Sequence, residues 1–128
     1  RDKDFYTLDI TRAQLPSVDL VLCRDLFIHM PNGQISKALA DAAKTGSQYF
    51  MCEMFSDDLS QCPVSAPINA DISASEFRPT NVTRPPFSLD DPILIVREDR
   101  GDGKKLMGLF DMSKVRKKMA LDVGFDLK

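Results

Sequence analysis

Several polar side chains that could bind a ligand follow apolar runs in the amino-terminal part of the chain. The run from Val18 to Cys23 has the length and composition of a strand buried on both faces, and Arg24, Asp25 and His29 follow it closely. Asp9 ends an earlier extended stretch. Ligands of open α/β sheets bind at the carboxyl ends of the strands, so we expect these polar groups to face one binding site.

Each of these side chains fits one chemical role and one structural role. The pKa of an unperturbed histidine suits His29 as a general base for a hydroxyl or amine, although a single histidine next to Met30 is also typical of packing. The carboxylate of Asp9 suits an amine on a ligand, and it equally suits an Asx-type cap of the following loop. Asp25 either contacts a ligand or forms a local ion pair with Arg24.

A strand, a helix and a second strand are predicted around these groups. Between Asn32 and Gly46, apolar residues recur at the spacing of one helix face, with Asn32 as the amino-terminal cap and Gly46 as a left-handed stop. Residues 47–55 are predicted to form the next strand. A strand–helix–strand order implies a right-handed crossover between two parallel strands, and this unit predicts the α/β class.

The last third of the chain is predicted to form a hairpin and a helix. The runs 93–96 and 104–110 are strand-like, and a glycine-rich segment at 99–103 joins them. This arrangement predicts an antiparallel hairpin. A helix with a solvated basic face is expected from Ser113 onward.

Length, charge and cysteine count limit the classes of protein to which this chain can belong. The 128 residues suffice for one domain, and the formal net charge of −2 gives no electrostatic reason to expect a nucleic-acid partner. The sequence has no apolar run of membrane-spanning length and no signal-peptide core at its amino terminus. Its three cysteines lack metal-type spacing, so reduced thiols in a cytoplasmic protein are expected, with Cys23 as a small apolar filler.

The order of these features resembles a known family. An acid that closes one strand (Asp9), then Leu15-Pro16, then Asp19-Leu20-Val21 and then a histidine (His29) is similar to class I S-adenosylmethionine-dependent methyltransferases. The resemblance implies a partial Rossmann-like sheet, with S-adenosylmethionine as cofactor and an acid at the position of Asp9 that reaches the amine of its adenine. The cofactor-binding residues implied in this way are Asp9, Ile10, Cys23, Arg24 and Asp25, with His29 as the candidate catalytic base.

A long polar loop carries a second part of the resemblance. Residues 56–92 are rich in Ser, Asp and Pro, and loops of this length are usually functional or disordered. Inside it, Phe77-Arg78-Pro79-Thr80-Asn81 and the later Pro86-Phe87 resemble a motif of small-molecule methyltransferases, with phenylalanine in place of the usual tryptophan. In that group the loop runs over the active-site mouth. The resemblance implies that Arg78 and Asn81 bind substrate, since a guanidinium suits a carboxylate or phosphate. Alternatively, both side chains tie the backbone of the loop together.

The sequence lacks the glycine-rich turn G-x-G-x-G that follows the first strand in this family. We therefore expect the chain to be the carboxyl-terminal part of a methyltransferase domain, completed by an amino-terminal segment or by a second chain. In the family's fold the strand ending at Asp9 lies beyond the two strands that are missing here. We expect Phe5–Ile10 to be displaced or to pack on another chain, and not to pair with Val18–Leu22.

Three classes of function follow from these features. The first is methyl transfer from S-adenosylmethionine to a small-molecule acceptor, which requires the missing strands and proceeds mainly by proximity and orientation. The second is a non-catalytic methyltransferase-like module that acts as a structural subunit of a larger assembly. The third is an unrelated α/β binding domain.

Overall fold

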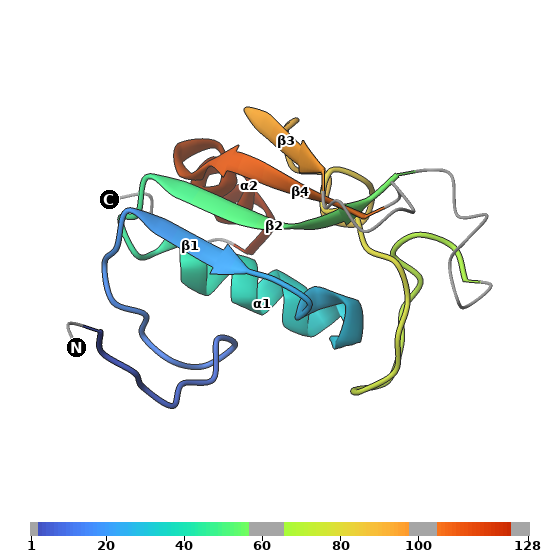
Figure 1. Ribbon diagram of the computed structural model, residues 1–128, viewed down its shortest axis with the longest axis horizontal. Helices are drawn as coiled ribbons and strands as arrows, with labels where there is room; N and C mark the ends of the chain where they lie inside the picture. Colours follow the sequence, from blue (N-terminus) through green and yellow to red (C-terminus); the bar gives the residue numbers. More distant parts are fainter. Residues whose placement is uncertain (1–2, 57–65, 98–104, 124–128) are drawn as a thin grey trace.

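The computed structural model describes residues 3–56, 66–97 and 105–123, which form a four-stranded mixed sheet and two α-helices (Figure 1). The sheet order is β1-β2-β4-β3, with β1 parallel to β2 and the other neighbours antiparallel. The predicted α/β class is confirmed. The elements are β1 (Leu20–Cys23), the 3₁₀ turn η1 (Phe27–His29), α1 (Asn32–Ala43), β2 (Tyr49–Phe55), β3 (Leu94–Arg97), β4 (Lys105–Asp111) and α2 (Met112–Val123).

The parallel crossover through α1 is confirmed. The apolar face of α1 is buried in the core, and its small alanines allow a close approach to α2. Pro31 occupies the cap position in place of Asn32, which already lies in the first turn and uses its side chain elsewhere. Gly46, with φ +74°, has the predicted left-handed conformation.

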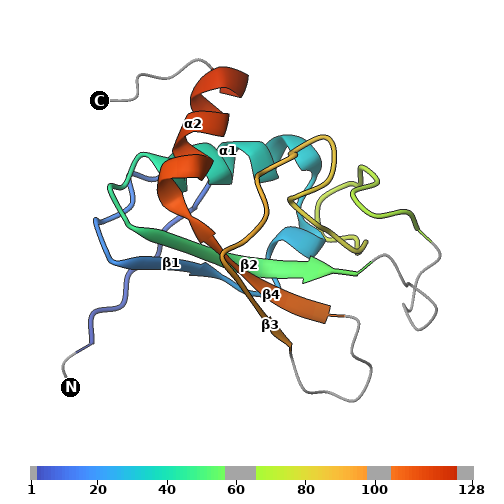
Figure 2. The ribbon, with the colours of Figure 1, turned by 90° about the horizontal axis from the view of Figure 1, so that it is seen from above.

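The hairpin is also confirmed, although its predicted turn at 99–103 lies outside the described residues. β4 pairs with both β2 and β3, so the last strand of the chain lies inside the sheet and β3 forms one edge. β4 runs directly into α2, where Ser113 donates its N–H to the Asp111 carboxylate at 2.9 Å. Figure 2 shows both helices on the same face of the sheet.

Side chains of the sheet alternate between this helix-covered face and an open one. In β1, Cys23 is 4% exposed and belongs to the core beneath the helices, whereas Leu20 and Leu22 are 40% and 56% exposed. A period of two along a strand separates these two sets. Within the described residues, no helix covers the face that carries Leu20 and Leu22.

Gly108 in the middle of β4 is required by close packing. A Cβ atom at this position would lie 2.7 Å from the Met54 sulfur and 2.9 Å from a ring carbon of Phe110. We expect Gly108→Ala to lower the free energy of unfolding by about 1–3 kcal/mol, because overpacking forces neighbouring side chains from their rotamers. Urea denaturation measures this change. Gly33, whose added Cβ would meet nothing within 4 Å, provides the control.

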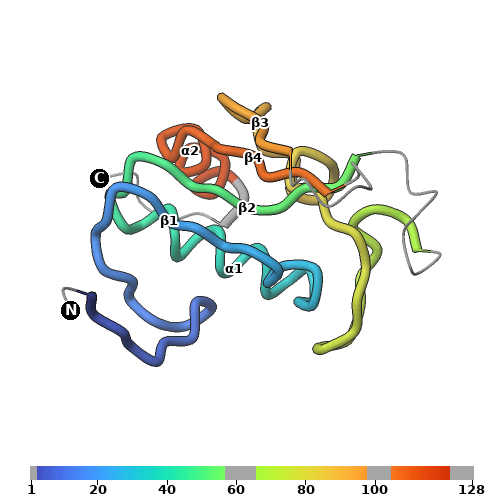
Figure 3. Tube along the Cα trace, viewed as in Figure 1, coloured from blue at the N-terminus to red at the C-terminus, as the bar shows by residue number. Residues whose placement is uncertain are grey.

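The predicted strand at Phe5–Ile10 is wrong. Residues 3–9 have no regular secondary structure, and a turn follows in which Arg12 and Ala13 donate to the carbonyl of Asp9 at 3.0 and 2.7 Å. Figure 3 shows this segment passing beside the sheet without joining it. A strand needs a partner, and this segment pairs with no described strand. The expectation that this segment does not pair with Val18–Leu22 is confirmed.

Candidate functional site

An apolar pocket of about 220 Å³ lies between the amino-terminal segment and β1. Two of the predicted cofactor-binding residues, Ile10 and Cys23, line this pocket. Ile10 belongs to the amino-terminal segment and Cys23 to β1, and these two segments do not pair as strands. Complete sites for small molecules usually have about 300–1,000 Å³, so this pocket suits one end of a ligand. Its lining residues are Leu8, Ile10, Leu15, Pro16, Val18, Val21, Leu22 and Cys23.

Asp9 lies between two residues that line this pocket, and its side chain is exposed. One carboxylate oxygen, Oδ1, accepts the N–H of Thr11 at 2.9 Å and the hydroxyl of Thr11 at 2.7 Å. These hydrogen bonds lower the pKa of Asp9 and keep it ionised. The Asx-type cap is therefore present, and no described residue donates to the other oxygen, Oδ2.

Arg24 and Asp25 form a turn at the carboxyl end of β1, as predicted. Asp25 has a left-handed backbone with φ +57°, which is uncommon for a residue other than glycine. Its carboxylate is ion-paired with Lys105 of β4, whereas the Arg24 guanidinium is 3.9 Å away. Asp25 thus has one ionic partner that is distant in sequence, Lys105, and one that is adjacent, Arg24.

Glu53 lies in β2 beneath this turn and was not predicted as a site residue. Its side chain is fully buried, and its Oε2 accepts the backbone N–H of Asp25 at 3.2 Å. Burial raises the pKa of Glu53, and the nearby Asp25 carboxylate acts in the same direction. Its other oxygen, Oε1, has no hydrogen-bond partner among the described residues. The available signal was a single acid within the apolar strand YFMCEMF.

His29 is exposed in η1, and its ring orientation is set by the long loop. Its Nδ1 lies 3.0 Å from the carbonyl oxygen of Glu76, and its ring meets the edge of Phe77 at a centroid distance of 6.0 Å. A carbonyl accepts only, so Nδ1 carries the proton and Nε2 of the neutral ring is the basic nitrogen. In the predicted role of His29 as a general base, Nε2 is therefore the atom that would accept the proton.

Arg78 is fully buried, and its guanidinium is held by the protein itself. Its Nη1 donates to the Phe27 carbonyl at 2.8 Å, and its Nη2 donates to the Met30 carbonyl at 2.7 Å and to the Asn32 side chain. Burial lowers the pKa of Arg78. These contacts join the loop to η1, and they favour the structural alternative over contact with a substrate.

Asn81 also ties the loop to the carboxyl end of the sheet. Its Nδ2 donates to the Phe55 carbonyl at 3.0 Å, and its Oδ1 accepts the N–H of Thr83 at 3.0 Å. The Phe55 N–H donates to the Thr80 carbonyl at 2.8 Å. The described part of the loop thus contacts the carboxyl end of β2 and the segment Phe27–Met30 that follows β1.

Asn69 organises the same loop and was missed in the sequence. It is 6% exposed, and its backbone is left-handed with φ +61°. Its Nδ2 lies within hydrogen-bonding distance of the carbonyls of Asn81, Arg84 and Pro85, at 2.8, 3.3 and 2.9 Å. Its Oδ1 accepts the Asn81 N–H at 2.9 Å. Asparagine tolerates the left-handed region better than most residues, which was the available signal.

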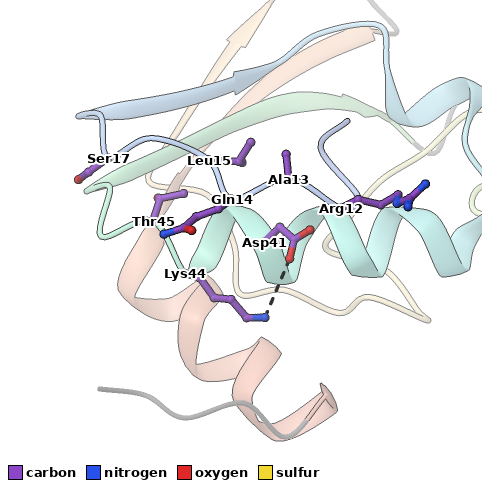
Figure 4. Close-up of a pocket in the computed structure, with 8 residues that line it drawn as sticks. All are labelled: Arg12, Ala13, Gln14, Leu15, Ser17, Asp41, Lys44 and Thr45. Carbon is purple, nitrogen blue, oxygen red and sulfur yellow. Dashed lines mark ion pairs between the residues drawn. The ribbon is translucent and has the colours of Figure 1, made fainter. Parts of the chain in front are cut away.

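A larger hollow of about 440 Å³ lies elsewhere, between the amino-terminal loop and the last turn of α1 (Figure 4). An ion pair of 4.0 Å joins Lys44 and Asp41 on its helix side. None of the predicted site residues lines it. Its lining residues are Arg12, Ala13, Gln14, Leu15, Ser17, Asp41, Lys44 and Thr45.

The two described cysteines are unsuited to nucleophilic chemistry. Cys23 and Cys52 are register partners on β1 and β2, and both thiols are free and buried. Burial raises the pKa of Cys23 to about 12 and that of Cys52 well above its usual range. Cys23 therefore acts as an apolar wall of the pocket. Across the described segments, no cluster of three or more His, Cys, Asp or Glu side chains could hold a metal ion.

No helix within the described part of the chain has the length and apolar character needed to cross a membrane. A scan against protein-family models, a search of curated proteins and a search of solved structures each gave no match to this chain.

Proposed function

We propose that this chain supplies the carboxyl-terminal part of a class I methyltransferase domain, which transfers a methyl group from S-adenosylmethionine to a small-molecule acceptor. The observation that carries the proposal is the apolar pocket between the amino-terminal segment and β1. Ile10 and Cys23 line it, and the ionised Asp9 lies directly beside Ile10. An apolar pocket with a carboxylate on an adjoining residue suits an adenine ring that carries an amine.

The topology of the sheet supports the same proposal. Class I methyltransferases end in an antiparallel hairpin whose last strand lies inside the sheet, and β4 lies between β2 and β3 in this way. The Phe5–Ile10 segment does not pair with β1, so within the described residues β1 is an edge strand to which the family's two further strands could pair. The exposed Leu20 and Leu22 of β1 would be covered by those strands and their helices.

The described residues fit separate parts of the reaction. Asp9 would accept a hydrogen bond from the adenine amine, and Ile10 and Cys23 would pack against the ring. The cofactor supplies an activated methyl group, and the protein contributes mainly proximity and orientation. His29 would accept a proton at Nε2 from a hydroxyl or amine acceptor, with Nδ1 fixed by the Glu76 carbonyl. Arg78 and Asn81 act here by holding the loop against η1 and the end of β2.

Asp9→Asn separates the cofactor role of Asp9 from its cap role. The amide keeps an oxygen for Thr11 but presents N–H groups to the adenine amine, where a donor cannot accept. We expect a roughly 10–100-fold weaker affinity of the full-length protein for S-adenosylmethionine, since a hydrogen bond to a charged group contributes about 1.5–3 kcal/mol. Calorimetry measures the affinity, and thermal unfolding should change little. An affinity equal to that of the wild type would leave Asp9 as a cap alone.

The isolated 128 residues should bind the cofactor negligibly. They contain the adenine-side residues but no glycine-rich turn to approach the rest of the molecule, which would stay largely in water. Calorimetry should therefore detect binding to the full-length protein and none to this chain alone at the same concentrations. A micromolar dissociation constant for the isolated chain would refute the proposal that binding also requires a segment outside these 128 residues. Absence of binding to the full-length protein would favour the non-catalytic module.

A further inference from the structure

Glu53 is a buried charged residue whose contribution to the stability of the fold is not evident. It is the single charged side chain in β2, its exposed fraction is 0%, and one of its oxygens has no partner among the described residues. A buried carboxyl group of this kind is usually less favourable than an apolar side chain of similar volume. A buried acid that does not stabilise the fold is expected mainly at functional sites.

The contacts of Glu53 point to the turn at the end of β1. Its Oε2 accepts the N–H of Asp25, whose backbone has the uncommon left-handed conformation. From β4, Lys105 pairs with the carboxylate of the same residue. Asp25 is thus held from two neighbouring strands, through its backbone by Glu53 and through its side chain by Lys105. This turn follows Cys23, a wall of the apolar pocket, directly.

We propose that Glu53 is a positioning residue that holds the Arg24–Asp25 turn in the geometry required for binding S-adenosylmethionine. The inference rests on the proposed function, because the ligand is the cofactor named there. Glu53 acts through the backbone of Asp25 and not by contact with the ligand, since its side chain is closed off from solvent. The fold retains an unfavourable buried acid because an apolar residue at this position could not accept the Asp25 N–H.

Glu53→Met tests this role, because methionine keeps the bulk of the side chain but accepts no strong hydrogen bond. In the full-length protein we expect S-adenosylmethionine to bind roughly tenfold more weakly, because the turn would no longer be held in its binding geometry. The melting temperature should stay equal or rise, because a buried acid has been removed. Glu53→Gln keeps an acceptor for the Asp25 N–H and should restore much of the affinity.

Thr80→Val is the matched control. Thr80 is also fully buried, and its hydroxyl also has no partner among the described residues, but its side chain is not bonded to the turn. This variant should match or exceed the wild-type melting temperature and keep the wild-type affinity. A purely structural role for Glu53 would instead lower the melting temperature of Glu53→Met and leave its affinity unchanged. That pattern would overturn the proposal.

Hydrogen exchange of the Asp25 amide tests the positioning role separately from the proposed function. In the wild type this amide should be protected by Glu53, and in Glu53→Met it should exchange at least roughly tenfold faster. If the wild type fails to bind S-adenosylmethionine, the proposed function fails, and the exchange rate still reports on the turn. Unchanged exchange of the Asp25 amide in Glu53→Met would refute the positioning role whether or not the cofactor binds.

Discussion

Replacing Arg78 with alanine is expected to lower the free energy of unfolding by roughly 3–5 kcal/mol, since it strands buried acceptors and leaves a cavity. The acceptors are the carbonyls of Phe27 and Met30 and the side chain of Asn32. Arg78→Lys should recover only a small part of the loss, because one ammonium group cannot reproduce the planar fork. Urea denaturation of the full-length protein measures both variants.

Arg84→Ala is the control for this experiment, because its side chain is exposed in the same loop. Its effect on unfolding should stay within about 0.5 kcal/mol. The competing interpretation of Arg78 as a substrate anchor makes the opposite prediction: wild-type stability together with a higher KM for an acidic acceptor. That result would contradict the structural role.

Asn69→Asp is expected to destabilise the protein by at least about 3 kcal/mol, because a buried carboxylate would replace the amide that donates to backbone carbonyls. Those carbonyls belong to Asn81, Arg84 and Pro85. Aspartate has nearly the same shape and tolerates the left-handed backbone, so the effect combines the lost donor with the burial of a negative charge. The shift of the urea midpoint measures it.

Asn69→Gly provides the comparison for this variant. Glycine adopts φ +61° without strain but makes none of the side-chain hydrogen bonds, so its loss of stability should be smaller than that of the aspartate variant. A greater loss for glycine than for aspartate would show that the side chain mainly fills space and that its donor is unimportant.

The fold was predictable where local pattern and tertiary packing agree. The alanine-rich face of α1 and the apolar runs of β1 and β2 led to the parallel crossover, because each segment has the period of its own structure. The segment Phe5–Ile10 has strand-like composition but forms no strand. Its conformation depends on a hydrogen-bonding partner, and local pattern carries no information about whether that partner is present.

The site was predictable only in part, and for a similar reason. Of the predicted cofactor-binding residues, Ile10 and Cys23 line one pocket, whereas Asp25 contacts Glu53 and Lys105. Arg78 fits both a substrate anchor and a loop staple, because both roles use the same donors. Only its burial distinguishes them. Glu53 and Asn69 act through contacts with residues distant in sequence, which spacing does not reveal.

The most direct test of the account is a titration of the full-length protein with S-adenosylmethionine, followed by the methyl resonance of Ile10. This side chain lines the apolar pocket beside Asp9, so an adenine ring bound there must change its environment. We predict a saturable shift of the Ile10 resonance, and none for the isolated 128 residues at the same concentrations. Saturable binding that leaves Ile10 unchanged, or no binding at all, would contradict the proposed site.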